Sequence, residues 1–260
     1  MAKDEPKLIV ARDGHVVTLT LNREKRRNAL DAELTKALIG ALKEADSEPG
    51  VRLVCITGAG QKAFCAGGDL ASDMSAEHGA AGALELFGDL LLCMESMQTP
   101  LLARVAGYCL GGGLGLALAC DLVVACDDAV FGTPEVRAGM FPMIIAPLVI
   151  RHAGSKRAME MIFCGRKVPA SEAMSMGFVN RVVPRAELDA TVEEVSADIL
   201  AGSPTAIGIG RRALAKTRGM QSEQATAELI TELMKVIASQ DAMEGIQAFL
   251  QKRKPIWKGR

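Results

Sequence analysis

Strand patterns alternate with helical patterns along the first half of the chain, and this order constrains the fold most. The clearest strand is Val16–Leu21, where β-branched residues recur at every second position after a turn at Asp13-Gly14. Leu8–Ala11, before that turn, is the expected hairpin partner. Further strands are expected at 53–57, 101–105 and 122–125, and helices at 34–45, 79–98 and 111–120. Because strands that alternate with helices form parallel β-α-β units, we predict an α/β fold.

The second half of the chain is mostly helical after Pro142, with one short strand expected near Val179–Val183. Three helical stretches follow Pro184, at 187–201, 205–216 and 221–250. We therefore predict a β/α core at residues 1–184 and a helical C-terminal domain at residues 185–260. The last helix carries an apolar stripe made by Leu229, Leu233, Val236 and Ile237. Such a stripe fits either core packing or an oligomer interface.

The composition argues against several classes of protein. The net charge is −1, so the chain has no long-range positive field to attract nucleic acid or an anionic membrane, which argues against both as main partners. Apolar residues make up 49%, which is enough for a large core and excludes disorder. The seven cysteines form no CxxC pair and lie mostly in apolar runs, as reduced structural thiols do. The charged N-terminal segment has no apolar stretch, so we expect no signal peptide and a cytoplasmic location.

Two glycine-rich segments follow predicted strands. The first runs from Ala63 to Leu70 (AFCAGGDL), and the second runs from Gly107 to Gly115 (GYCLGGGLG) into a predicted helix. Glycines let the backbone turn tightly, and amide N–H groups at a helix start have no intrahelical partner. Two such groups that converge can stabilise a developing negative charge as an oxyanion hole. Neither segment matches a phosphate-binding loop, and a glycine triplet alone also fits close packing of a helix on a sheet.

A third segment places one carboxylate after a short apolar run. It reads Phe131-Gly132-Thr133-Pro134-Glu135. A carboxylate in an apolar pocket has a raised pKa, which suits acid–base work near neutral pH. The alternative is a surface or capping glutamate after Pro134.

Together these segments resemble the crotonase superfamily, also called the enoyl-CoA hydratase/isomerase family. Two further segments carry the resemblance, Arg27-Asn28-Ala29-Leu30 and the closing stretch at 244–259 (EGIQAFLQKRKPIWKG). The resemblance implies a crotonase-like spiral of repeated ββα units with a helical C-terminal trimerisation domain. It also implies trimers, often paired into hexamers. Members bind acyl-CoA thioesters and stabilise an enolate formed at the thioester carbonyl.

The resemblance also implies roles for single residues. The amide N–H groups of Gly68 and Gly112 would form the oxyanion hole, and Glu135 would exchange a proton with the carbon next to the thioester. The residues expected to bind the CoA part are Arg26, Arg27, Ala66, Asp69, Leu70, Lys252 and Arg253. Among them, Asp69 is interpreted as mainly a helix cap, and the last two come from a neighbouring subunit in some members. Coenzyme A would enter as part of the substrate, and no metal or other cofactor is expected.

Two departures from the family pattern bear on the reaction. Typical hydratases have a second glutamate where this chain has Gly115, so a single acid must serve, or another must enter from Asp73, Glu77 or Glu85. The second departure is the bulky stretch 143–151, which replaces a glycine-rich run. The segment around Gly115 also resembles methylglutaconyl-CoA hydratases. A distal carboxylate on such a substrate would need a basic partner, for which the candidates are Arg104, Arg137 and Arg151.

Three functions stay open on the sequence. The first is a hydro-lyase that hydrates a short enoyl-CoA, branched in the methylglutaconyl-like reading, or dehydrates the 3-hydroxyacyl-CoA. The second is a Δ3-Δ2 enoyl-CoA isomerase that uses one glutamate. The third is a non-catalytic acyl-CoA-binding subunit, against which the presence of Glu135 argues.

Overall fold

A six-stranded sheet is the larger of the two sheets in the described structure. The computed structural model describes residues 5–69 and 79–259. The strand order is β1-β2-β3-β5-β7-β10, in which β1 is antiparallel to β2 and the remaining neighbours are parallel. The predicted hairpin and the parallel sheet are therefore confirmed. The bounds are Leu8–Asp13, Val16–Leu21, Leu53–Gly58, Leu101–Val105, Leu122–Cys126 and Arg181–Val183.

The structure also contains a second, smaller sheet, which the sequence analysis did not predict. Its order is β4-β6-β8-β9, with bounds Ala63–Cys65, Tyr108–Leu110, Val130–Gly132 and Lys167–Pro169. The first three strands are parallel, and each directly follows a strand of the large sheet. A helix comes after each such pair of strands, which gives the repeated ββα units of the predicted spiral. All carboxyl ends of the small parallel strands therefore meet at one edge.

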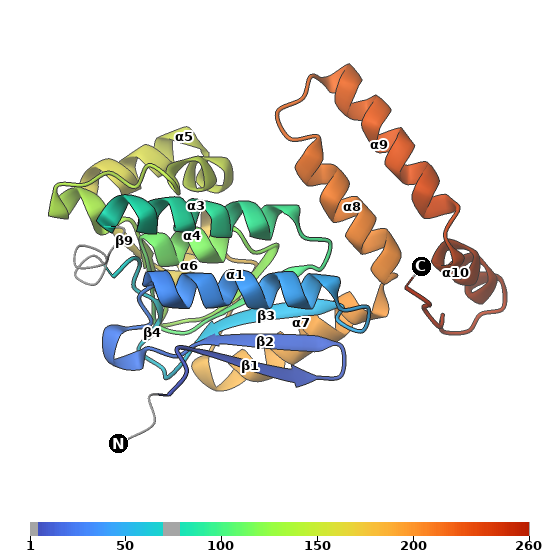
Figure 1. The fold of residues 1–260 in the computed structure, drawn as a ribbon, viewed down its shortest axis with the longest axis horizontal. Coiled ribbons are helices and arrows are strands. Elements are labelled where there is room, and N and C mark those ends of the chain that lie inside the picture. Colours follow the sequence, from blue (N-terminus) through green and yellow to red (C-terminus); the bar gives the residue numbers. More distant parts are fainter. Residues whose placement is uncertain (1–4, 70–78, 260) are drawn as a thin grey trace.

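Helices cover the large sheet and bury its apolar side chains. Figure 1 shows α1, α3 and α4 stacked along one side, while α7 packs against β3 and β7. In α1 the carboxylate of Asp31 caps the first turn by accepting a hydrogen bond from Leu34 N at 2.8 Å. Leu34, Leu38 and Leu42 follow at helical spacing and are fully buried. The helices between β2 and the C-terminal region are α1 Ala32–Ser47, α3 Gly79–Ser96, α4 Gly112–Leu118, α5 Ala146–Cys164, α6 Ala170–Ser175 and α7 Leu188–Ala201.

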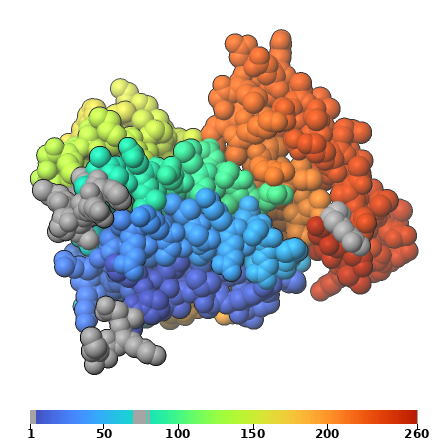
Figure 2. Space-filling view, in the orientation of Figure 1, coloured from blue at the N-terminus to red at the C-terminus, as the bar shows by residue number. Residues whose placement is uncertain are grey.

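The last three helices lie together on one side of the molecule, as Figures 1 and 2 show, and the first of them packs against α3. They are α8 Pro204–Lys216, α9 Ser222–Ile237 and α10 Gln240–Leu250. The prediction of one helix over 221–250 was wrong, because Ser239 interrupts it and caps α10 by accepting a hydrogen bond from Ala242 N at 3.1 Å. The predicted boundary at residue 184 falls between β10 and η3 (Arg185–Glu187). It stays a prediction, since α7 beyond it still packs on the sheet.

All seven cysteines are free thiols. Burial raises the pKa of Cys55 and of Cys65 to about 12. Cys164, at the end of α5, is the exposed one. Across the described ranges, no helix is long and apolar enough to cross a membrane.

Candidate active site

The first glycine-rich loop is held by a short backbone ladder. Ala66 N donates to Arg27 O at 3.0 Å, Leu30 N donates to Gly67 O at 2.8 Å, and Asp69 N donates to Leu30 O at 2.8 Å. Residues 66–69 therefore run parallel to residues 27–30. The N–H of Gly68 lies between these bonds and has no hydrogen-bond partner in the described part of the chain. It is free to donate to a ligand.

Asn28 holds the segment 27–30, which is the partner of residues 66–69 in this ladder. Its side chain is fully buried, and its backbone has a positive φ of 56°, which asparagine tolerates better than most residues. The amide group donates to Ala59 O at 3.0 Å and to Ala63 O at 2.8 Å. Its oxygen accepts from Arg23 N at 3.0 Å. The sequence analysis used Asn28 as part of a motif but missed this positioning role.

Arg23 joins the loop to α1. Its guanidinium contacts the carboxylates of Asp69 at 2.8 Å and Asp31 at 3.0 Å, and Lys7 contacts Asp31 at 2.8 Å. Both aspartates are almost fully buried. The structure thus places Asp69 in a buried ion-pair cluster. Sequence reasoning missed Arg23, which is separated from Asp69 by 46 residues.

The second glycine-rich loop meets the first. Gly111, whose φ is +54°, donates its N–H to Gly132 O at 2.9 Å, and α4 begins at the next residue. A side-chain carbon on Gly112 would lie 3.6 Å from Gly68 N, so the two backbone segments touch. Within the described residues, the Gly112 N–H also has no partner. A side-chain carbon on Gly113 would collide with Cys65 O, so Gly113 serves close packing.

Glu135 lies beside this pair of loops. It belongs to the 3-10 helix η2 (Pro134–Ala138), which follows β8 at the same edge of the small sheet. A side-chain carbon on Gly111 would lie 2.9 Å from Glu135 Oε1, and Oε2 is buried with no hydrogen-bond partner in the described structure. Burial raises the pKa of the Glu135 carboxyl, an effect that its own backbone N–H partly opposes.

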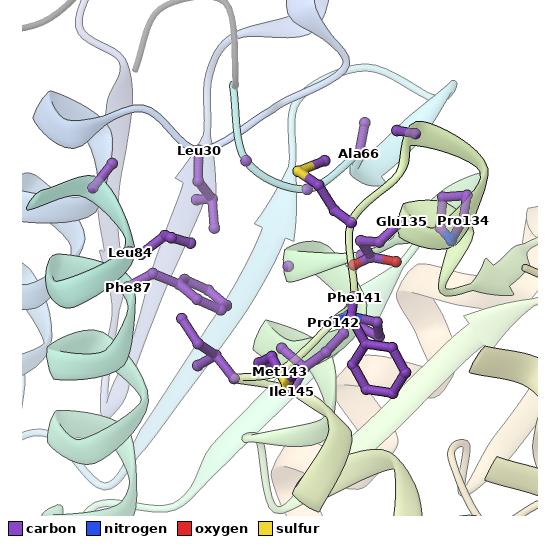
Figure 3. A pocket seen from close by; sticks show the side chains of 18 of the residues that line it. Leu30, Ala66, Leu84, Phe87, Pro134, Glu135, Phe141, Pro142, Met143 and Ile145 are labelled. Carbon is purple, nitrogen blue, oxygen red and sulfur yellow. The ribbon is translucent and has the colours of Figure 1, made fainter. Parts of the chain in front are cut away.

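A cavity of about 540 Å³ opens in front of these groups. Both glycine loops, Glu135 and several apolar side chains line it, and Figure 3 shows how they surround it. The labelled apolar ones include Leu30, Leu84, Phe87, Phe141, Met143 and Ile145. Since Asp31 is held in the Arg23 cluster, Glu135 is the unpaired carboxylate among the described lining residues. No group of His, Cys, Asp or Glu in the described chain is arranged to hold a metal ion.

Side chains of the cavity wall occupy the space that a side chain at position 115 would need. A side-chain carbon there would collide with the Cγ2 methyl of Ile145 and would lie 3.4 Å from Phe87 Cζ. Ile145 itself is only 2% exposed. The wall that would carry a second acid is therefore apolar and packed.

Comparison with known proteins agrees with this architecture. The family model described as enoyl-CoA hydratase/isomerase matches residues 11–260. The chain belongs to the enoyl-CoA hydratase/isomerase family. It is 34% identical to the carnitinyl-CoA dehydratase of Escherichia coli, over 97% of this chain and 98% of that protein. Its activity is thus of the hydratase or isomerase kind.

Solved structures of the family superpose over nearly the whole chain. The enoyl-CoA hydratase of Bacillus anthracis matches with a TM-score of 0.94 at 32% identity, covering 98% of this chain and 100% of that one. The enoyl-CoA hydratase of Mycobacterium smegmatis matches with a TM-score of 0.91 at 36% identity, covering 97% and 99%. The crotonase-type fold expected from the sequence is therefore confirmed.

The described residues that were expected to bind CoA lie in different parts of this family member. Ala66 lines the Glu135 cavity. Arg26 and Arg27 are exposed in the η1 segment (Glu24–Arg26) and just after it, outside that cavity. Lys252 and Arg253 follow α10, which Figure 1 shows on the other side of the molecule. A single chain therefore does not bring all four basic residues together.

The remaining predicted positions are one CoA-binding residue, Leu70, and the three candidates for a second acid. The structure gives no support for a second acid at any position that it describes. Leu70, Asp73 and Glu77 lie outside the described residues. Glu85 is described, is exposed on α3, and does not line the cavity.

Replacing Glu135 by glutamine is expected to raise the thermal stability of this hydratase-family fold near pH 8. The folded state raises the carboxyl pKa above the ordinary value of 4.5, so the fold binds the proton more tightly than the unfolded chain does. Stability then falls as the pH rises from the ordinary pKa through the raised one. The melting temperature of the variant should be higher than that of the wild type at about pH 8. Near pH 4 the two melting temperatures should be equal. A variant that melts earlier at both pH values would contradict the unpaired state of Glu135.

Proposed function

We propose that this enzyme reversibly hydrates a short enoyl-CoA thioester. One observation carries the proposal: the free N–H groups of Gly68 and Gly112 and the carboxylate of Glu135, whose Oε2 has no partner among the described residues, face one apolar cavity. The two N–H groups would hold the thioester oxygen, where preorganised donors stabilise developing negative charge. The names of the relatives, hydratases and a dehydratase, support the same class of reaction.

One carboxylate is enough for a balanced hydration. Glu135 takes a proton from water while the water oxygen adds to C3 of the enoyl group. The electron pair of the double bond moves onto the thioester oxygen, which Gly68 and Gly112 hold as an enolate. The enolate then collapses, and the protonated Glu135 returns its proton to C2. The reverse sequence is dehydration, and a raised pKa lets one group do both steps near neutral pH.

An isomerase is the second candidate, and the packed wall at Gly115 favours it. With Ile145 in that space, the cavity presents one acid and an apolar surface. Glu135 could then move a proton from C4 to C2 of a 3-enoyl-CoA without adding water. A non-catalytic acyl-CoA-binding subunit is the third outcome that the test must separate.

A product assay by mass spectrometry in heavy-oxygen water separates these functions. The substrates are 2-enoyl-, 3-enoyl- and 3-methylglutaconyl-CoA, and Glu135→Gln is the control. Uptake of labelled oxygen that depends on Glu135 supports the hydratase. A double-bond shift without label supports the isomerase and overturns the hydratase. Binding of thioesters without any turnover supports the binding subunit.

The acyl group of the proposed substrate is short and carries a distal carboxylate, as in 3-methylglutaconyl-CoA. Bulky side chains at 140–145 line the cavity. Of the three arginines considered, Arg137 lines it and has no acidic partner among the described residues. Arg104 instead pairs with Asp189 at 2.6 Å, and Arg151 is not part of the lining.

Arg137→Gln is expected to raise KM about tenfold for 3-methylglutaconyl-CoA and little for crotonyl-CoA, which has no distal charge. The loss is that of a charge-assisted hydrogen bond to the carboxylate. Arg151→Gln removes the same charge outside the cavity and serves as the control. Equal KM changes for both substrates would remove the distal-carboxylate assignment.

We also propose that the enzyme is a trimer or a dimer of trimers. The C-terminal helices expose large apolar side chains, including Ile246 at 63% and Phe249 at 83%. Large apolar side chains that are exposed three residues apart on one helix are typical of a protein interface. Packing by a second copy would also offer Lys252 and Arg253 to the CoA of a neighbouring subunit.

Ile246→Asp combined with Phe249→Asp is expected to reduce the assembly to monomers, because each buried carboxylate opposes association. Light scattering coupled to gel filtration measures the mass. Glu223→Asp, on an exposed position of α9, is the control. A wild-type protein that runs as a monomer would overturn the assembly itself.

A further inference from the structure

The first strand of the large sheet leaves one edge of its backbone unpaired. In the described part of the chain β1 has a single neighbour, β2, and Figure 1 shows it on the outer side of the sheet. Its side chains are exposed from Ile9 to the end of the strand, with 57% of Val10 accessible. An exposed edge of six residues with apolar side chains is a template for pairing with another strand.

The register of the hairpin determines which groups of β1 face outward. Asn22 N donates to Lys7 O at 2.7 Å, which makes these two residues a hydrogen-bonded pair in that register. Along an antiparallel ladder, hydrogen-bonded pairs alternate with pairs that exchange no bonds. The odd-numbered residues of β1 therefore bond to β2, and the N–H and C=O groups of the even-numbered ones point away from it. These outward groups belong to Leu8, Val10 and Arg12, and none has a partner in the described structure.

A second copy of β1 satisfies all of these outward groups in one register. When two β1 strands run antiparallel about a two-fold axis at Val10, this residue pairs with its own counterpart, and Leu8 pairs with Arg12. A shift of the axis by one residue in one direction puts Arg12 opposite Pro6, which has no N–H. A shift in the other direction puts Leu8 opposite Gly14, in the turn of the hairpin. The edge is thus self-complementary when Val10 lies on the axis.

We propose that β1 pairs in this way with β1 of a second copy of the chain. On one face of the sheet Val10 would contact Val10 of the second copy, and on the other face Ile9 would contact Ala11. Both contacts remove exposed apolar surface from water. Asp13, which forms no ion pair among the described residues, would lie opposite Lys7, whose ammonium group also contacts carboxylates at the start of α1. Opposite charges therefore meet at both ends of the pair.

The size of the contact decides which assembly it joins. Stable interfaces bury about 1,200 Å² or more, which a single pair of short strands does not supply. The pairing therefore rests on the proposed trimer, in which the β1 edges of all subunits act together. It assigns β1 to the contact between two trimers and leaves the exposed face of α10 for the contact within each trimer.

Cysteine cross-linking tests the register directly. Val10→Cys would place two thiols on the axis, with Cα atoms about 5.5 Å apart, which a disulfide can span. Arg12→Cys is the control on the same strand, because its two copies would lie roughly 13 Å apart. Both variants are made in a Cys164→Ser background, since Cys164 is the exposed native thiol. After mild oxidation, a non-reducing gel should show Val10→Cys as a covalent dimer and Arg12→Cys as a single chain. Equal cross-linking in both variants, or none in Val10→Cys, would overturn the register.

The mass of the assembly tests the contact itself. Val10→Pro removes the outward N–H at the axis without removing a bond to β2, whereas Val10→Thr keeps that N–H and serves as the control. By light scattering coupled to gel filtration, the wild type and Val10→Thr should have twice the mass of Val10→Pro, and circular dichroism checks that all three fold. A wild type that runs as a trimer or a monomer, or a mass that Val10→Pro leaves unchanged, would contradict the pairing. Neither measurement needs turnover, so failure of the proposed hydration reaction would be seen separately.

Discussion

Glu135→Gln is expected to lower kcat for the preferred thioester by about 10²–10⁴-fold, the range typical of general acid–base catalysis. Glutamine keeps the size of the side chain but cannot accept the proton from water or return it to C2. The oxyanion donors are backbone groups and stay in place, so the affinity for the thioester should change little. Steady-state kinetics and a binding titration measure the two effects separately.

Glu85→Gln is the matched control for this result. It makes the same chemical change on exposed α3, outside the cavity lining. Full activity of Glu135→Gln, or an equal loss in both variants, would show that the acid lies elsewhere. A loss in Glu135→Gln alone assigns the proton transfer to one carboxyl.

Gly115→Glu is expected to destabilise the fold by roughly 3 kcal/mol or more, without adding a working second acid. The first carbon of the new side chain would collide with the Ile145 methyl and would lie 3.4 Å from Phe87 Cζ, so the carboxylate would enter an apolar wall. The described surroundings offer it an apolar wall. Urea denaturation measures the change in the free energy of unfolding.

Gly115→Ala separates crowding from charge burial. Alanine adds one carbon that also collides with the Ile145 methyl, but it buries no charge, so this variant should lose less stability than Gly115→Glu. Adding Ile145→Ala to Gly115→Glu should restore part of the stability by opening space. The prediction is contradicted if Gly115→Glu is as stable as the wild type and hydrates enoyl-CoA faster. That result would mean that the cavity wall beside Gly115 can accommodate a second acid.

The large sheet was predictable because its strands are long enough to show a pattern. Val16–Leu21 alternates over six residues, and Leu53–Gly58 is a continuous buried run. The strands of the small sheet have three residues each, which is too short for a period of two to appear. Their existence depends on the tertiary path that returns the chain to one edge.

The glycine loops and Glu135 were predictable from motif and position, but the parts that hold them were not. Asn28 bonds to Ala63 across 35 residues, and Arg23 reaches Asp69 across 46. A local sequence pattern cannot predict a contact between residues that lie so far apart along the chain. The break at Ser239 had a local signal, since serine before a new apolar period is a typical N-cap.

The exposed thiol at the end of α5 offers a practical route to follow ligand binding. Burial keeps the pKa of Cys55 and of Cys65 far above neutral, while Cys164 is accessible. The carbonyl of Cys164 accepts a hydrogen bond from the cavity residue Arg137 at 3.3 Å. A fluorophore attached through a maleimide should therefore modify Cys164 first. It would report on the surroundings of Arg137 in the native sequence, without an engineered labelling position.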